Sequence, residues 1–165
     1  MQTAPIKTMP QTNKSEERLS LSQAAHYLLE ECRMVLPGIQ ALFGFQLIAV
    51  FNERFNKELN GGEQICHLFA IGFVALAVAL VMTPAAYHRT TGTDSVTRYF
   101  IKVSTRLLLL SMFPLAMGVT LDFYLIAYII LHNAILSALL AGTFFLIFMV
   151  AWFIFPHLAK GASHL

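Results

Sequence analysis

The feature that most constrains this chain is a long stretch almost without charge in its second half. Between Arg106 and Lys160, Asp122 is the only residue with a formal charge. A soluble domain usually carries about 25% charged residues, whereas this chain has 12%. A helix that crosses the hydrocarbon core of a bilayer, about 30 Å thick, needs about 20 apolar residues. The stretch therefore predicts an integral membrane protein of the all-α class.

The uncharged stretch is too long for one membrane crossing. As a single helix, residues 107–155 would extend roughly 74 Å, more than twice the thickness of the core. The chain must therefore fold back, and we expect the turn between Asp122 and Asn133. The apolar runs predict a four-helix bundle with spans at about 34–51, 65–87, 101–124 and 132–155.

The segments outside the spans are polar or amphipathic. Residues 1–19 are rich in polar and charged side chains and are expected to form a disordered cytoplasmic tail. From Leu21 to Arg33, apolar residues recur with a helical period, so this helix either lies in the headgroup plane or leads into the first span. The transmembrane domain is predicted over residues 20–158, and residues 159–165 form a C-terminal tail.

The basic residues predict an orientation. Cytoplasmic loops of membrane proteins carry an excess of Lys and Arg. The first loop contains two of them, Arg54 and Lys57, and the third turn contains none. The other nine fall on the opposite side: Lys7, Lys14, Arg18, Arg33, Arg89, Arg98, Lys102, Arg106 and Lys160. Both termini are therefore expected in the cytoplasm. The expected membrane is the bacterial cytoplasmic membrane.

The start of the first span carries the most informative polar residues. Arg33, Pro37 and Gln40 lie on one face of a continuous helix. They either form a polar path or contact a ligand between helices, or they only fix the packing of the helices. In the packing alternative, Arg33 pairs with Glu30 at the interface, and Gln40 donates a hydrogen bond to a neighbouring helix.

Asp122 is the only carboxylate after Asp94, which belongs to the second loop. In mid-membrane it would be a candidate for proton or cation handling. The predicted span boundaries instead place it near the outer end of the third span, where a carboxylate costs little. His132 and Asn133 would then face it across the turn.

Three residues at the exit of the second span form another candidate group. Tyr87, His88 and Arg89 either anchor the helix at the interface or bind a lipid phosphate through Arg89.

Several kinds of partner are not expected. Cys32 and Cys66 are not spaced as zinc ligands, so we expect no metal site and no cofactor. The net charge of +2 is too small to suggest nucleic acid. The expected partners are the lipid bilayer and either further copies of the chain or a larger membrane complex.

Two motifs resemble those of a bacterial family of small multi-span membrane proteins known only as a domain of unknown function. The first runs from Glu31 to Phe43 with the pattern E-x-R-x-x-L-P-G-x-Q-x-L-F, and the second, P-x-A-Y-H-R, ends at Arg89. An Arg-Phe pair at Arg54 follows the first span. The resemblance implies the same topology and singles out these residues: Glu31, Arg33, Pro37, Gln40, Arg54, Tyr87, His88 and Arg89.

The function is less constrained than the topology. We expect a non-enzymatic accessory or assembly protein, and the alternative is a small oligomeric ion or solute transporter of the cation or proton type. Some members of the resembled family are labelled sodium–proton antiporters, but this chain lacks the paired intramembrane carboxylates expected for ion exchange. An enzyme that acts on lipid through His88 or His132 is least favoured, because no nucleophile, base and metal converge. No catalytic residue is therefore predicted.

Overall fold

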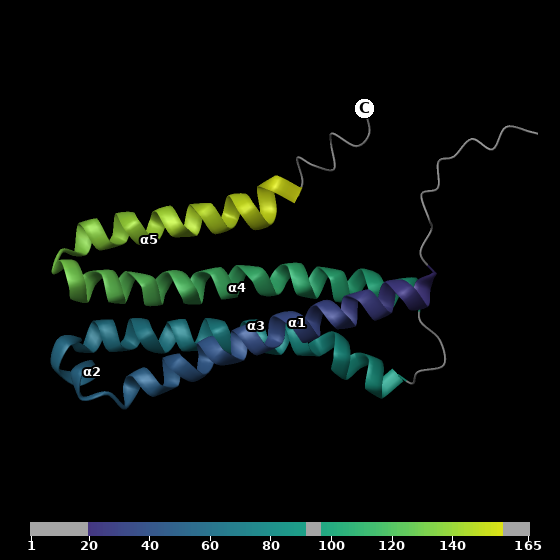
Figure 1. Cartoon of the computed structure of the whole chain (residues 1–165), viewed down its shortest axis with the longest axis horizontal. Helices are drawn as coiled ribbons and strands as arrows, with labels where there is room; N and C mark the ends of the chain where they lie inside the picture. Colours follow the sequence, from purple (N-terminus) through teal and green to yellow (C-terminus); the bar gives the residue numbers. More distant parts are fainter. Residues whose placement is uncertain (1–19, 92–96, 157–165) are drawn as a thin grey trace, which may run out of the picture.

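The fold is all-helical, as a computed structural model shows for residues 20–91 and 97–156. Four helices are long and apolar enough to cross a membrane, which confirms the predicted all-α four-helix membrane bundle. The elements are α1 (Leu21–Val50), α2 (Glu53–Glu58), α3 (Gly61–Thr91), α4 (Arg98–Leu131), α5 (Ala134–Met149) and a short π-helix, η1 (Val150–Ile154), that continues α5 (Figure 1). The predicted tails, 1–19 and 159–165, fall outside the described residues.

The amphipathic segment and the first span form one continuous helix. Ser20 caps α1 through a capping box with Gln23, whose backbone N–H donates to Ser20 Oγ and whose side chain accepts from the Ser20 N–H. The segment therefore leads into the span instead of forming a separate helix. Its apolar stripe faces the bundle, since Ala25, Leu28 and Cys32 are buried.

The turn between α4 and α5 lies farther along the chain than the predicted end of span three at residue 124. His132 ends α4 in the left-handed region, with a φ of 50°. The side chain of Asn133 then caps α5 by accepting hydrogen bonds from the backbone N–H groups of Ile135 and Leu136. Asp122 consequently lies nine residues before the end of α4, or roughly 14 Å along the helix.

Helices α3 and α4 pack most closely, because small residues meet at their interface. Ala70, Val74 and Ala77 of α3 are fully buried. Gly118 of α4 lies so near α3 that a Cβ atom there would be 2.6 Å from Val74 Cγ2 and 3.0 Å from the Ala70 carbonyl oxygen. Such close approach is a common means of helix association in membranes, where dispersion contacts take the place of the hydrophobic effect.

Helix α5 lies at the edge of the bundle. It packs chiefly against α4, on the side away from α1 and α3 (Figure 1). Its outward side chains are large and apolar, with Ile135 76%, Leu139 64% and Leu146 63% exposed. These side chains suit contact with lipid or with another transmembrane helix.

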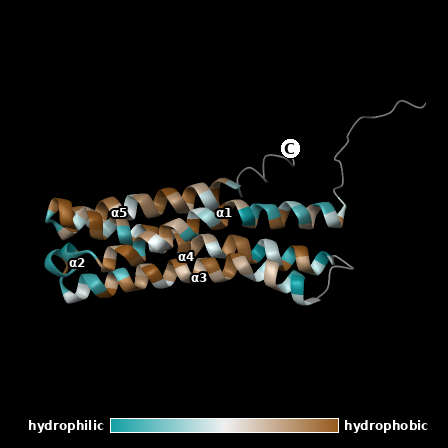
Figure 2. Ribbon diagram, turned by 60° about the horizontal axis from the view of Figure 1, so that its bottom comes forward, coloured by the Kyte–Doolittle hydropathy of each residue, from teal (hydrophilic) through white to brown (hydrophobic). Residues whose placement is uncertain are grey.

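The bundle has two chemically different ends. One, the basic end, holds the last turns of α3 and the first turns of α4, with Arg89, Arg98, Lys102 and Arg106; α1 starts at the same end (Figure 1). The opposite end, the α2 end, holds α2 and the His132–Asn133 turn. Figure 2 shows hydrophilic residues towards both ends of the bundle and a predominantly hydrophobic band between them.

Replacing Gly118 by Ala should destabilise the bundle by about 1–3 kcal/mol, because the added methyl overlaps Val74 and α3 has to move. Gly142 of α5 is the matched control, since a Cβ there meets nothing within 4 Å. Gly142→Ala should leave stability unchanged or raise it by up to about 1 kcal/mol. Thermal unfolding of both variants in one detergent checks this, and equal midpoints would refute the close α3–α4 contact.

Candidate functional site

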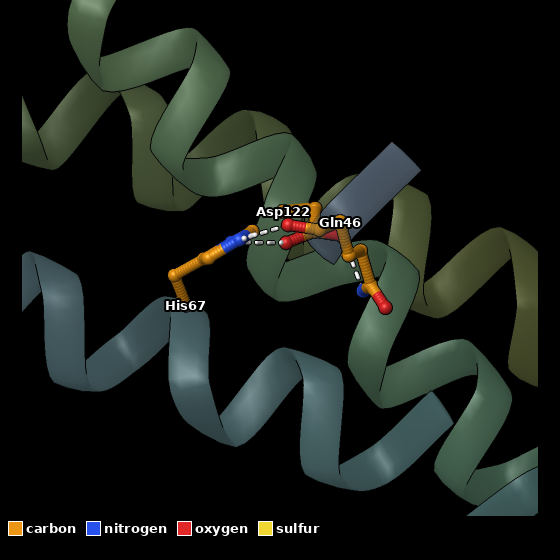
Figure 3. Close-up of polar contacts among 3 residues, drawn as sticks. All are labelled: Gln46, His67 and Asp122. Atoms are coloured by element: carbon orange, nitrogen blue, oxygen red, sulfur yellow. Dashed lines mark hydrogen bonds and ion pairs between the residues drawn. The ribbon is translucent and has the colours of Figure 1, made fainter. Parts of the chain in front are cut away.

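Three polar side chains from three helices meet inside the bundle. The amide Nε2 of Gln46 in α1 donates a hydrogen bond to Asp122 Oδ2 in α4 at 2.6 Å. The other carboxylate oxygen, Oδ1, lies 3.1 Å from Nδ1 of His67 in α3. The remaining ring nitrogen, His67 Nε2, lies 3.0 Å from the backbone carbonyl oxygen of Gln46. These residues, which point toward one another in Figure 3, are called the polar cluster below.

The polar cluster is shielded from the exterior. Gln46 is 3% exposed and His67 is 6% exposed, and the Asp122 side chain is 16% exposed. Helix α2 contributes to this cover, because the ring of Phe55 meets the His67 ring edge-on with centroids 5.3 Å apart. Leu59, directly after α2, is also buried. The cluster therefore lies in a low-dielectric environment, where isolated charges are costly.

The hydrogen-bond partners of His67 determine how many protons the pair holds. The Gln46 carbonyl oxygen can only accept, so Nε2 must carry a hydrogen. The contact between Nδ1 and Asp122 Oδ1 needs one further proton, which sits either on the imidazole or on the carboxyl group. In both arrangements His67 and Asp122 together have zero net charge. Losing the shared proton would leave a net charge of −1 inside the bundle.

A pocket of about 270 Å³ adjoins the polar cluster. Gln46, His67 and Asp122 are its polar lining residues. The rest of its lining is apolar and comes from α1, α2, α4 and the residue after α2: Leu42, Phe45, Ala49, Phe55, Leu59, Leu125, Ile126 and Ile129.

A second hollow lies beside the first, toward the α2 end. It is lined by the polar residues Arg54, Glu58, Asn52 and His132. It shares four lining residues with the apolar pocket: Ala49, Phe55, Leu59 and Ile129. The two hollows are therefore neighbours, and these four residues separate the polar surface around α2 from the region of Asp122.

One atom of the polar cluster lacks a partner. The amide of Gln46 points its Nε2 atom at Asp122. Its other polar atom, Oε1, is buried and accepts no hydrogen bond within the described part of the chain. An unsatisfied buried acceptor costs about 1–3 kcal/mol.

The candidate residues of α1 do not join the polar cluster. Glu31, Arg33, Pro37 and Gln40 are exposed on α1. The suggested Arg33–Glu30 pair does not form; Glu30 lies 3.7 Å from His26 Nε2 instead. The structure thus does not bring Arg33 and Gln40 together with Asp122 in one cavity.

The other predicted residues lie at the two ends of the bundle. At the basic end, Tyr87 stacks on Phe100 and His88 meets the same ring edge-on, each with centroids 5.7 Å away, while Arg89 is exposed. At the α2 end, Arg54 lines the second hollow.

The partners of Asp122 differ from those suggested by the sequence. Its contacts are Gln46 and His67, not His132 and Asn133 across the turn, because α4 continues to Leu131 and carries the turn away. Sequence reasoning missed His67. The available signal was that His67 is the only histidine of the predicted span 65–87, and that ionisable residues inside a membrane usually pair with one another.

Comparisons with known proteins give a family but no activity. A family model described as a family of unknown function, DUF6328, matches residues 14–156, which confirms the resemblance to a domain of unknown function. No curated protein matches, and no solved structure matches. Among the residues that the structure describes, no group of three or more His, Cys, Asp or Glu side chains is placed to hold a metal ion.

We expect strong coupling between His67 and Asp122 in a double-mutant cycle. His67→Leu and Asp122→Leu should each destabilise the protein by about 3–5 kcal/mol, since each leaves the other residue buried without its ionisable partner and with only Gln46 to bond. The double variant should lose less than the sum, with a coupling of about 0.5–3 kcal/mol. Reversible unfolding in mixed micelles measures all four proteins.

The exposed pair Glu53–Lys57 on α2, 3.4 Å apart, provides the matched control cycle. Its coupling should stay below about 0.5 kcal/mol. Additive losses at His67 and Asp122 would contradict a direct bond between them.

Proposed function

The chain belongs to DUF6328, a family of unknown function, and we propose from its polar cluster that it is a non-enzymatic membrane protein that exchanges protons and monovalent cations. The exchange site is the His67–Asp122 pair with Gln46. The observation that carries this proposal is a buried carboxylate and imidazole whose nearest atoms lie 3.1 Å apart, a contact that requires one shared proton when His67 Nε2 donates to Gln46. Ionisable residues inside membranes commonly mark ion pathways and proton relays.

The charge of the pair explains why a cation would replace the proton. The pair is neutral while it holds the shared proton, and it carries −1 when that proton leaves. A buried negative charge is costly unless it is paired. The carboxylate of Asp122 and the unpartnered Gln46 Oε1 are both oxygen ligands, which suit a hard cation such as Na⁺. His67 here takes the place of the second carboxylate that the sequence lacks.

The hollow beside α2 supports access from one side. It extends from Arg54 and Glu58 to the residues that border the apolar pocket. On the side of the basic end, Ile39, Val74 and Val81 pack into one hydrophobic cluster. Transport across the whole membrane would require this cluster to open, either in one chain or in an oligomer.

The distribution of basic residues supports an orientation for this exchange. Arg89, Arg98, Lys102 and Arg106 all belong to the basic end, and Arg54 and Lys57 belong to the α2 end. By the positive-inside rule, the basic end and both termini face the cytoplasm of a bacterial cell, and α2 faces outward. The polar cluster would then be loaded from the outer side.

A second candidate function rests on α5. This helix packs chiefly against α4, and its outward face is apolar. Such a face supports the accessory or assembly role expected from the sequence, in which the polar cluster only fixes helix packing. That role predicts that Asp122 can be replaced without any change in ion flux.

Asp122→Asn should abolish cation-driven proton movement in proteoliposomes. The amide cannot carry the exchanged proton, so the flux should fall roughly 10²-fold or more. A trapped pH-sensitive dye reports the flux after an imposed Na⁺ or K⁺ gradient. Glu53→Gln is the matched control, because Glu53 is an exposed carboxylate on α2 and its loss should leave the flux unchanged.

Two results would count against ion exchange. One is a wild-type protein that moves no protons with any monovalent cation. The other is an Asp122→Asn protein, folded by its unfolding midpoint, with the flux of the wild type. The second result would favour the accessory role.

The orientation can be tested with single cysteines in a variant whose Cys32 and Cys66 are replaced by alanine. A membrane-impermeant maleimide should label Asn60→Cys in right-side-out vesicles and leave Ser22→Cys unlabelled until the membrane is opened. Both positions are exposed in the protein, so burial does not protect either of them. The reverse pattern would invert the proposed topology.

A further inference from the structure

The apolar pocket beside the polar cluster has the properties of a ligand site. Its volume is about 270 Å³, which corresponds to roughly nine water molecules at the volume of about 30 Å³ that each occupies in the liquid. Its walls combine many apolar side chains with few polar groups, as is usual for small-molecule sites. Phe45 and Ile126, on its walls, are 71% and 56% exposed, so a molecule dissolved in the bilayer can reach it from the side.

The unpartnered oxygen of Gln46 defines the polar end of the ligand. Gln46 is 97% buried and lines this pocket, yet its Oε1 accepts no hydrogen bond among the described residues. Figure 3 shows Oε1 turned away from Asp122. No other residue that lines the pocket supplies the missing donor. Oε1 has almost no exposed surface, so a donor in the pocket reaches it when the amide rotates about the last side-chain torsion, which is soft in Gln, and this rotation also moves Nε2 relative to Asp122.

We propose that this pocket binds a small lipophilic molecule with a single hydroxyl or N–H donor at one end, such as a medium-chain alcohol. The apolar body fills the space between α1 and α4, and the donor bonds to Gln46 Oε1. The acyl chain of a phospholipid would also fill the apolar space, but it has no donor at its tip. The pocket would exist equally in an accessory protein, whereas in an ion exchanger the bound donor and the cation would compete for Gln46 Oε1.

Photolabelling of the full-length protein in lipid nanodiscs tests this site. The probe is octanol that carries a diazirine on its chain, and the adduct is located by mass spectrometry. Labelling is expected at Phe45, Ile126 and their neighbours on α1 and α4. At equal concentrations in the bilayer, 1-octanol should compete roughly three- to tenfold more strongly than octane, because octane lacks the hydrogen bond.

A pair of variants separates the pocket from general contact with lipid. Ala49→Phe fills the pocket with an apolar side chain and leaves the polar cluster in place, so labelling there should fall about tenfold or more. Ala138→Phe adds the same ring to an exposed position of α5, outside the pocket, and should leave the labelling unchanged.

Two outcomes would overturn the proposal. Equal competition by octane and octanol in the wild-type protein would show that an acyl chain occupies the pocket and that Gln46 recognises no donor. Unchanged labelling in Ala49→Phe would place the bound probe elsewhere. The competition result comes from the wild type, so it stands even if a variant fails to fold.

Discussion

The hydrogen bond between His67 and Asp122 is the interaction on which the arrangement of the first three long helices depends. It joins α3 to α4, and the same two residues contact the side chain and the backbone of Gln46 in α1. In a bilayer, apolar side chains give a helix little reason to prefer a neighbouring helix over lipid, so polar contacts and close packing determine which faces meet. One shared proton keeps the pair neutral and makes its burial tolerable. If this proton is removed, the buried pair carries a net charge of −1.

Packing and polar contacts divide the bundle into regions of different character. Toward the basic end and the middle, small residues such as Gly118 and Ala70 bring α3 and α4 together, and Ile39, Val74 and Val81 fill the space beside α1. Toward the α2 end, the helices leave room for a pocket and a neighbouring polar hollow. The polar cluster lies at the boundary between the closely packed region toward the basic end and the open space toward the α2 end. An ion or a lipophilic molecule that reaches this boundary meets the few polar side chains that line the apolar pocket.

The fold was largely predictable because the apolar runs are long and the charged residues lie outside them. The helical period of the apolar residues from Leu21 to Arg33 predicted a helix there, and its buried residues, Ala25, Leu28 and Cys32, all belong to that apolar stripe. The end of α4 was harder to place, because residues 123–131 are apolar and carry no turn signal. His132, which lies in the left-handed region, ends α4, and Asn133 caps the start of α5. Arg33 and Gln40 are exposed, because the face of α1 that packs contains Ala25, Leu28, Cys32, Ile39 and Gln46 instead, and they therefore lie outside the site.

The sequence by itself determined that the chain is helical and belongs in a membrane, because hydropathy and charge act residue by residue along the chain. It singled out Asp122 as an ionisable group but placed it near the outer end of the third span, where a carboxylate costs little. Only the tertiary structure decided that Asp122 lies inside the bundle and which residues it contacts, since His67 and Gln46 lie 55 and 76 residues away in sequence. Nothing in the local pattern distinguishes a histidine that faces a carboxylate from one that faces lipid. That distinction arises when α1, α3 and α4 pack and bring one turn of each to the same depth.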